Sequence, residues 1–200
     1  MRVYAESNFV LEIALDQEEV GACRDLIEGA TAKHISVVIP AVSVFEPFYK
    51  IAGSGKRRRD LAQQVEAQAR EFGRTKGFEE SSRSLRDLIR VFAESENAEQ
   101  AGLSSALETV LKTCEVIPLT ADVVSRALTD VHPRLGLDLP DALVYASVLE
   151  HLRTASTDKS CFITKNANDF GDPDIENELA ALDCKLLFKF SDGLGYSKAS

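Results

Sequence analysis

Short apolar segments rich in β-branched residues recur along the chain, and segments with helical periodicity separate them. Candidate strands cover residues 3–5, 35–40, 114–119, 161–165 and 184–190. Strands that are separated by helices need crossover connections, which favour a parallel sheet with helices on both faces. The pattern therefore predicts an α/β fold, and the length of 200 residues suits a single domain spanning 1–200.

The middle of the chain, residues 54–113, departs from this alternation. It is rich in Ala, Gln, Glu, Leu and Arg and has few β-branched residues, which is typical of exposed helices. Turn-forming residues at 73–77 and the polar stretch near Ser95 are expected to divide it into three helices. We therefore predict an enlarged helical insertion within the α/β domain.

The charge of the chain is unevenly distributed. The net charge is −9, but residues 50–90 hold 11 of the 23 basic residues and only 6 acidic ones. The densest basic run is Lys56, Arg57, Arg58 and Arg59. Phosphate binding depends on such residues, although a solvated helix face also explains a basic run. We name these four residues as candidate substrate contacts.

The remaining composition indicates a cytoplasmic protein without a membrane partner. No run of about 18 apolar residues could span a bilayer, and charges at Arg2 and Glu6 interrupt the N-terminal apolar stretch that a secretory signal requires. The four cysteines are widely spaced, so they suggest neither a paired metal motif nor a disulfide framework.

Acidic residues follow several of the predicted strands. Glu6 comes directly after the first strand, Glu46 lies in the helix after the second, and Asp141 opens a later helix. Each has an ordinary explanation, such as a partly exposed helix turn for Glu46 or helix capping for Asp138 and Asp141. Functional groups of parallel sheets gather beyond the carboxyl ends of the strands, however. Together, these oxygens indicate a site for Mg²⁺ or Mn²⁺.

Four motifs support a family resemblance. "VYAESNFVLEIAL", "IPAVSVFEPFYK", "LDLPDALVYASVLE" and "FITKNANDF" occur in the order that is seen in PIN-domain proteins, which this chain resembles. The resemblance implies a Rossmann-like three-layer fold, similar to that of the 5′ nucleases. It also implies a magnesium- or manganese-dependent endoribonuclease with RNA as substrate, as in toxins of the VapC type. A small antitoxin-like protein partner and a homodimer are left open.

The resemblance also assigns roles to individual residues. Glu6 matches the first acid of the family, which is usually Asp, and Glu46 and Asp141 match the second and third. At the fourth position Asn166 replaces a carboxylate, and Asp169 is the nearby substitute. The implied metal ligands are Glu6, Glu46, Asp141, Asn166 and Asp169, and the four acids among them are the implied catalytic residues. The implied supporting residues are Ser7, Asn8, Asp138 and Thr164.

Two departures from the family pattern keep a second function open. Glu6 moves a carboxylate outward by about 1.5 Å relative to Asp, and Asn166 removes one negative charge. The rival interpretation is a PIN-like scaffold that binds RNA or protein and has lost catalysis. Other enzyme classes lack their signatures, because the chain has neither a GxGxxG turn nor a GxSxG elbow.

Overall fold

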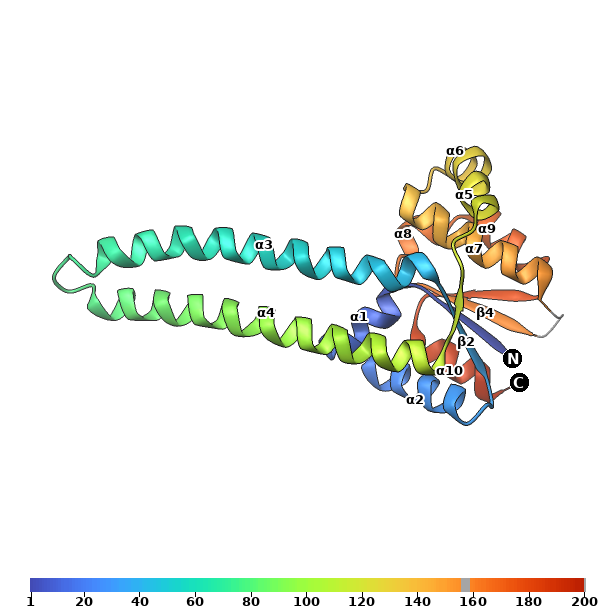
Figure 1. Ribbon diagram of the computed structural model, residues 1–200, viewed down its shortest axis with the longest axis horizontal. Coiled ribbons are helices and arrows are strands. Elements are labelled where there is room, and N and C mark those ends of the chain that lie inside the picture. The colour runs from blue at the N-terminus through green and yellow to red at the C-terminus, as the bar shows by residue number, and fades with distance from the viewer. Residues whose placement is uncertain (156–158, 200) are drawn as a thin grey trace.

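A computed structural model describes residues 1–155 and 159–199 of the protein, and it contains one sheet of five parallel strands (Figure 1). The strand order is β3-β2-β1-β4-β5, with every neighbouring pair parallel. The strands are β1 (Arg2–Ala5), β2 (Ser36–Pro40), β3 (Glu115–Ile117), β4 (Ser160–Ile163) and β5 (Cys184–Leu187). The predicted parallel α/β fold is confirmed.

Helices cover both faces of this sheet. One face carries α1 (Ser7–Leu15), α2 (Val20–Thr31), α10 (Phe190–Lys198) and the sheet-proximal ends of α3 (Ala41–Phe72) and α4 (Glu79–Thr113). The other face carries α5 (Ala121–Arg126), the π-helical turn η1 (Ala127–Val131), α7 (Leu139–Thr154), α8 (Ala167–Phe170) and α9 (Pro173–Ala180). A short helix, α6 (His132–Leu135), follows η1. The arrangement has the three layers that the sequence predicted.

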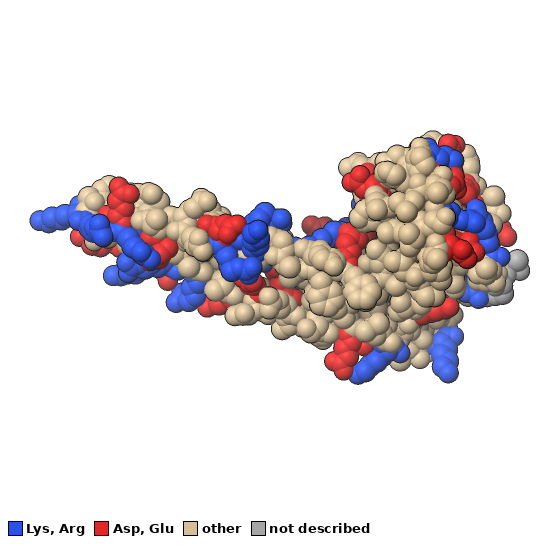
Figure 2. Space-filling model, turned by 45° about the horizontal axis from the view of Figure 1, so that its top comes forward, with Lys and Arg blue, Asp and Glu red and all other residues tan. Residues whose placement is uncertain are grey.

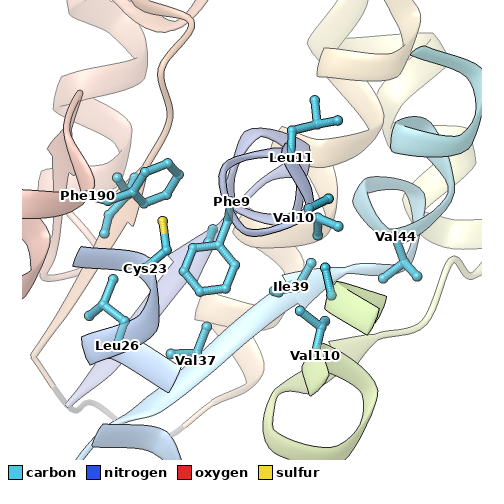
Figure 3. Packing of buried hydrophobic residues seen from close by; sticks show 14 of the residues in the cluster. Phe9, Val10, Leu11, Cys23, Leu26, Val37, Ile39, Val44, Val110 and Phe190 are labelled. Carbon is cyan, nitrogen blue, oxygen red and sulfur yellow. The ribbon is translucent and has the colours of Figure 1, made fainter. Parts of the chain in front are cut away.

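Alternating strand residues build the two cores. In β2, Val37 and Ile39 belong to the cluster under α1 and α2, whereas Val38 belongs to the cluster under α7. Successive side chains of a strand point to opposite faces, so a continuous apolar run fills both cores. Figure 3 shows Phe9 and Phe190 meeting in the first cluster, with ring centroids 5.4 Å apart.

The strand order reverses direction at β1. The chain runs from β1 out to β2 and β3, then returns to place β4 and β5 on the other side of β1. Such a reversal point is where open α/β sheets bind ligands. Ala5 pairs with Ile163 in register, so the next residues, Glu6 and Thr164, leave the same edge of the sheet.

Helices α3 and α4 form an arm that projects from the globular part (Figure 1). With 32 and 35 residues, they are about 50 Å long at 1.5 Å per residue. The helix that follows β2 continues without a break into the predicted insertion. The prediction of three helices was wrong, because the chain breaks only between Phe72 and Glu79 and α4 runs through Ser95. The Ser95 hydroxyl donates to the Phe92 carbonyl, so the serine is accommodated within the helix.

Ion pairs and close backbone packing hold the arm together. Arg58 donates to both carboxylate oxygens of Glu99, and Arg59 pairs with Glu96. At the tip, the rings of Phe72 and Phe78 stack. None of the described helices is both long and apolar enough for a membrane span.

The base of the arm packs tightly against α1 at a glycine. A β-carbon built on Gly102 would lie 2.1 Å from the backbone oxygen of Ala14. Backbone cannot move aside as a flexible side chain can, so only glycine permits this approach between α4 and α1.

We predict that Gly102→Ala lowers the free energy of unfolding by about 1–3 kcal/mol, because the helices must separate to admit the methyl group. Gly21→Ala is the matched control. A β-carbon at Gly21, also helical, meets nothing within 4 Å, so this change should raise stability by about 0.5–1 kcal/mol. Urea denaturation measures both values, and equal effects at the two positions would contradict the prediction.

Candidate active site at the carboxyl edge of the sheet

Glu6 is a buried carboxylate that caps α1. Its Oε2 accepts hydrogen bonds from the Asn8 backbone N–H at 2.8 Å and the Ser7 hydroxyl at 2.9 Å. Its Oε1 accepts from the Asn8 side-chain amide at 2.8 Å and from the Lys165 backbone N–H at 3.3 Å. The residue that caps the helix is therefore Glu6, although serine is the more usual capping residue and Ser7 follows directly. The longer side chain of glutamate can fold back onto the helix N-terminus.

The turn after β4 is fixed by hydrogen bonds of its own. The buried Thr164 hydroxyl accepts from the Asn166 backbone N–H at 3.0 Å. Asn166 then directs its side-chain amide at two carboxylates, donating to Asp141 Oδ2 at 3.4 Å and to Asp169. The turn thereby brings residues of β4 and α8 to the acid at the start of α7.

Asp141 lies in the first turn of α7 and is partly buried. Burial raises the pKa of its carboxyl to about 6, and repulsion from Asp169, Glu46 and Glu6 adds to the effect, against a smaller opposing influence of Lys50. Asp138 occupies the N-cap position of α7 and is exposed, but its side chain makes no capping hydrogen bond. The position agrees with the capping interpretation, and the expected bond is missing.

Glu46 and Asp169 complete the group of acids. Glu46 is partly buried on α3, where Lys50 lies 2.9 Å from its Oε1 in the next turn. Its apolar helix neighbours, Phe45 and Phe48, are exposed. Asp169 is exposed in α8 and accepts from Asn166. Asp169, Glu46 and Glu6, which follow three different strands, thus act electrostatically on Asp141.

The polar side chains of the site form hydrogen bonds with one another. Within residues 1–155 and 159–199, no three His, Cys, Asp or Glu side chains are placed to hold a metal ion. A carboxylate oxygen can accept about two hydrogen bonds, and each oxygen of Glu6 already accepts two. A metal ion would have to replace some of these donors.

The donor set nevertheless suits a hard cation. Its ligating atoms are carboxylate and amide oxygens, which Mg²⁺ and Mn²⁺ prefer. Burial and the nearby carboxylates both raise the pKa of Asp141, and a divalent cation would oppose both effects by favouring the ionised carboxylate. The residues fit a divalent metal by chemistry, with Asn166 able to offer its carbonyl oxygen in place of its amide hydrogens.

Sequence reasoning missed an ion pair beneath the site. Glu12 of α1 is buried, and its Oε1 accepts from the Lys165 ammonium at 2.5 Å while its Oε2 accepts from the Glu19 backbone N–H at 2.8 Å. The hydrogen bond from Lys165 to Glu12 raises the pKa of Lys165. The signal was present, because Glu12 interrupts the apolar stretch "VLEIAL" and a buried carboxylate requires a partner.

The basic run on the arm divides into two pairs. Arg58 and Arg59 are engaged by carboxylates of α4. Lys56 and Arg57 are exposed, and the described residues place no carboxylate in ion-pair contact with either; Arg57 donates to the Ser54 hydroxyl at 2.8 Å. Of the four candidate substrate contacts, Lys56 and Arg57 therefore have positive charges that could pair with a phosphate, whereas Arg58 and Arg59 are already paired with carboxylates.

A comparison with family models agrees with this geometry. The model that describes the PIN domain matches residues 3–170, which covers the sheet edge, all four acids and the whole arm. The chain belongs to the PIN-domain family. No curated protein and no solved structure gave a significant match. PIN domains are generally nucleases that act on RNA and typically use divalent metals.

The raised pKa of Asp141 predicts how the stability of this PIN domain depends on pH. Its folded-state pKa of about 6 lies above the ordinary value of 3.8. The folded state therefore binds the proton more tightly, and ionising Asp141 costs stability as the pH rises from about 4 through 6. Asp141→Asn removes that cost.

In a chelating buffer, Asp141→Asn should melt at a higher temperature than the wild type at pH 7.5. The difference between the two proteins should shrink as the pH falls to 4, because the wild-type carboxyl is then neutral as well. Melting curves at several pH values measure this difference. The prediction would be contradicted if the melting temperature of Asp141→Asn exceeded that of the wild type by less at pH 7.5 than at pH 4.

Proposed function

We propose that this PIN domain is a metal-dependent endoribonuclease that hydrolyses RNA phosphodiester bonds with Mg²⁺ or Mn²⁺. The observation that carries the proposal is Asp141, a partly buried acid whose pKa is raised by burial and, in addition, by the carboxylates of Asp169, Glu46 and Glu6. Mutually repelling acids at the reversal point of a sheet are typical of a functional site. Family membership supports the same class of reaction.

The proposed ligands come from separate elements. Asp141 of α7, Glu46 of α3 and Asp169 of α8 supply carboxylate oxygens, and Asn166 supplies its amide oxygen. Glu6 joins them by giving up its longest hydrogen bond, the 3.3 Å bond from the Lys165 backbone. Its other three hydrogen bonds hold the carboxylate in place at the N-terminus of α1.

When bound, the metal would activate a water nucleophile and offset the charge that develops on the phosphodiester. The protein residues around it have positioning roles. Lys50 holds the Glu46 carboxylate through its 2.9 Å ion pair, and the ion pair of Lys165 with Glu12 fixes the turn that carries Asn166. Thr164 fixes the same turn from within by accepting the Asn166 backbone N–H.

One observation favours a second candidate function, an RNA- or protein-binding scaffold without catalysis. The Asn166 amide donates to Asp141 and Asp169, and each carboxylate oxygen of Glu6 already accepts two hydrogen bonds. The site can therefore exist without a cation. The scaffold predicts RNA binding that needs no metal and is not followed by cleavage.

Cleavage of a mixed pool of structured RNA in the presence of Mn²⁺ separates the two functions. The wild type should cut, and Asp141→Asn should reduce the rate by at least about 100-fold, because a ligand carboxylate is lost. Asp122→Asn is the matched control, because Asp122, like Asp141, lies in the first turn of a helix, here α5. Cutting that persists in a chelator or in Asp141→Asn would mean a contaminating nuclease, and no cutting by partner-free protein would favour the scaffold.

Asn166→Asp tests the ligand set by restoring a carboxylate. Without metal, the variant should melt at a lower temperature than the wild type, because it adds charge and loses both amide hydrogen bonds. With Mn²⁺, its melting temperature should rise more than that of the wild type. Thermal melts with and without Mn²⁺ measure both shifts. A variant that responds to Mn²⁺ no more than the wild type would exclude position 166 from the ligand set.

A further inference from the structure

Three large aromatic side chains are exposed next to the acids. Phe45, Phe48 and Tyr49 of α3 expose 61%, 48% and 79% of their surface. They lie in the first turns of the helix, around Glu46, rather than in either core. Exposed apolar side chains are common singly, but three in five residues form a patch that indicates a binding surface.

Helical spacing places these residues on one face of α3. Positions 45, 48 and 49 are separated by three and four residues, so their side chains are neighbours on the helix surface. Glu46 follows Phe45 by one residue and lies at the side of this face, with Lys50 beside it. We call Phe45, Phe48 and Tyr49 the aromatic face.

Positive charge continues the aromatic face away from the acids. Lys56 lies seven residues after Tyr49, which is two helical turns and about 10 Å along the same side of the helix. Lys56 and Arg57 are exposed, and neither forms an ion pair within the described part of the chain. Figure 2 shows basic and acidic side chains mixed along the arm and a largely uncharged surface over part of the junction between the arm and the globular part.

We propose that the aromatic face stacks the unpaired bases of single-stranded RNA, and that Lys56 and Arg57 hold phosphates of the same strand along the arm. Aromatic rings beside cations are what single-strand binding uses, because every base has a face that can stack. A duplex hides the faces of its bases, so the surface selects single strands. This inference deepens the proposed function, on which it rests for the identity of RNA as substrate.

The charges favour RNA over a second copy of the chain. Lys56 and Arg57 are cations without carboxylate partners within residues 1–155 and 159–199, and they lie beside rings. A polyanion with stackable bases complements both features at once.

Tryptophan fluorescence tests the stacking directly, because the chain contains no tryptophan. Tyr49→Trp places the only indole on the aromatic face, and Leu88→Trp places one at an exposed position of α4 as the control. The probe is a uridine oligomer of about ten nucleotides, added in a chelating buffer at low salt. The oligomer should quench the emission of Tyr49→Trp and leave that of Leu88→Trp unchanged.

Affinity and salt dependence test the two halves of the surface. Tyr49→Ala should weaken binding of the oligomer about tenfold, while Tyr49→Phe and Leu88→Ala should bind as the wild type does. Replacing Lys56 and Arg57 with Gln should lower the slope of log affinity against log salt by about 0.7 for each phosphate that the variant no longer neutralises. The same oligomer annealed to its complement should bind more weakly.

Several results would overturn the proposal. These are binding without quenching of Tyr49→Trp, wild-type affinity in Tyr49→Ala, or emission that depends on protein concentration without RNA, which would assign the face to a second copy. The binding assays contain no metal, so they are independent of catalysis. Quenching without manganese-dependent cleavage would retain the stacking surface and refute the nuclease, and cleavage without quenching would do the reverse.

Discussion

The hydrogen bonds to the Glu6 carboxylate join the two halves of the protein. Three of its four donors come from the start of α1, and the fourth is the backbone of Lys165 after β4. These segments are 159 residues apart in sequence and meet only because β1 and β4 pair in the sheet. The ion pair of Glu12 with Lys165 is a second connection between the same two segments. The sheet edge that carries the acids depends on both connections.

The acids also show how a binding site can be compatible with folding. Burying a carboxyl and bringing like charges near it both oppose folding, and the raised pKa of Asp141 reflects both costs. The protein offsets part of these costs with donors of its own, through the Asn166 amide beside Asp141 and the Lys50 ammonium beside Glu46. The site is therefore stable without a metal, and the metal that we propose would take the place of some of these donors.

Charged side chains also help to stabilise the arm, beyond the sheet. A pair of long helices cannot bury much apolar surface, and here interhelical ion pairs of Arg58 and Arg59 add to the packing of small residues such as Gly55. Surface ion pairs contribute little individually, so the contact of α4 with α1 at Gly102 matters for how the arm is held. The first turns of α3 then present both Glu46 and the aromatic face.

Much of the fold was determined by local sequence. The β-branched strands, the helical periodicity between them and the long helix-forming middle segment predicted a parallel α/β sheet with a helical enlargement, because these signals depend on near neighbours. The four acids could also be named from sequence, since each follows a strand or opens a helix. The predicted break at Ser95 failed because a serine within a helix can bond to its own backbone.

What the tertiary structure decided was which partners those residues meet. The sequence could not show that Glu6 folds back to cap α1, that Asn166 bridges two acids, or that Lys165 neutralises Glu12. It also could not separate Arg58 and Arg59, which α4 engages, from Lys56 and Arg57, which remain exposed. Contacts of this kind join residues far apart in the chain. Only the packing of the sheet and the pairing of the arm helices bring them within hydrogen-bonding distance.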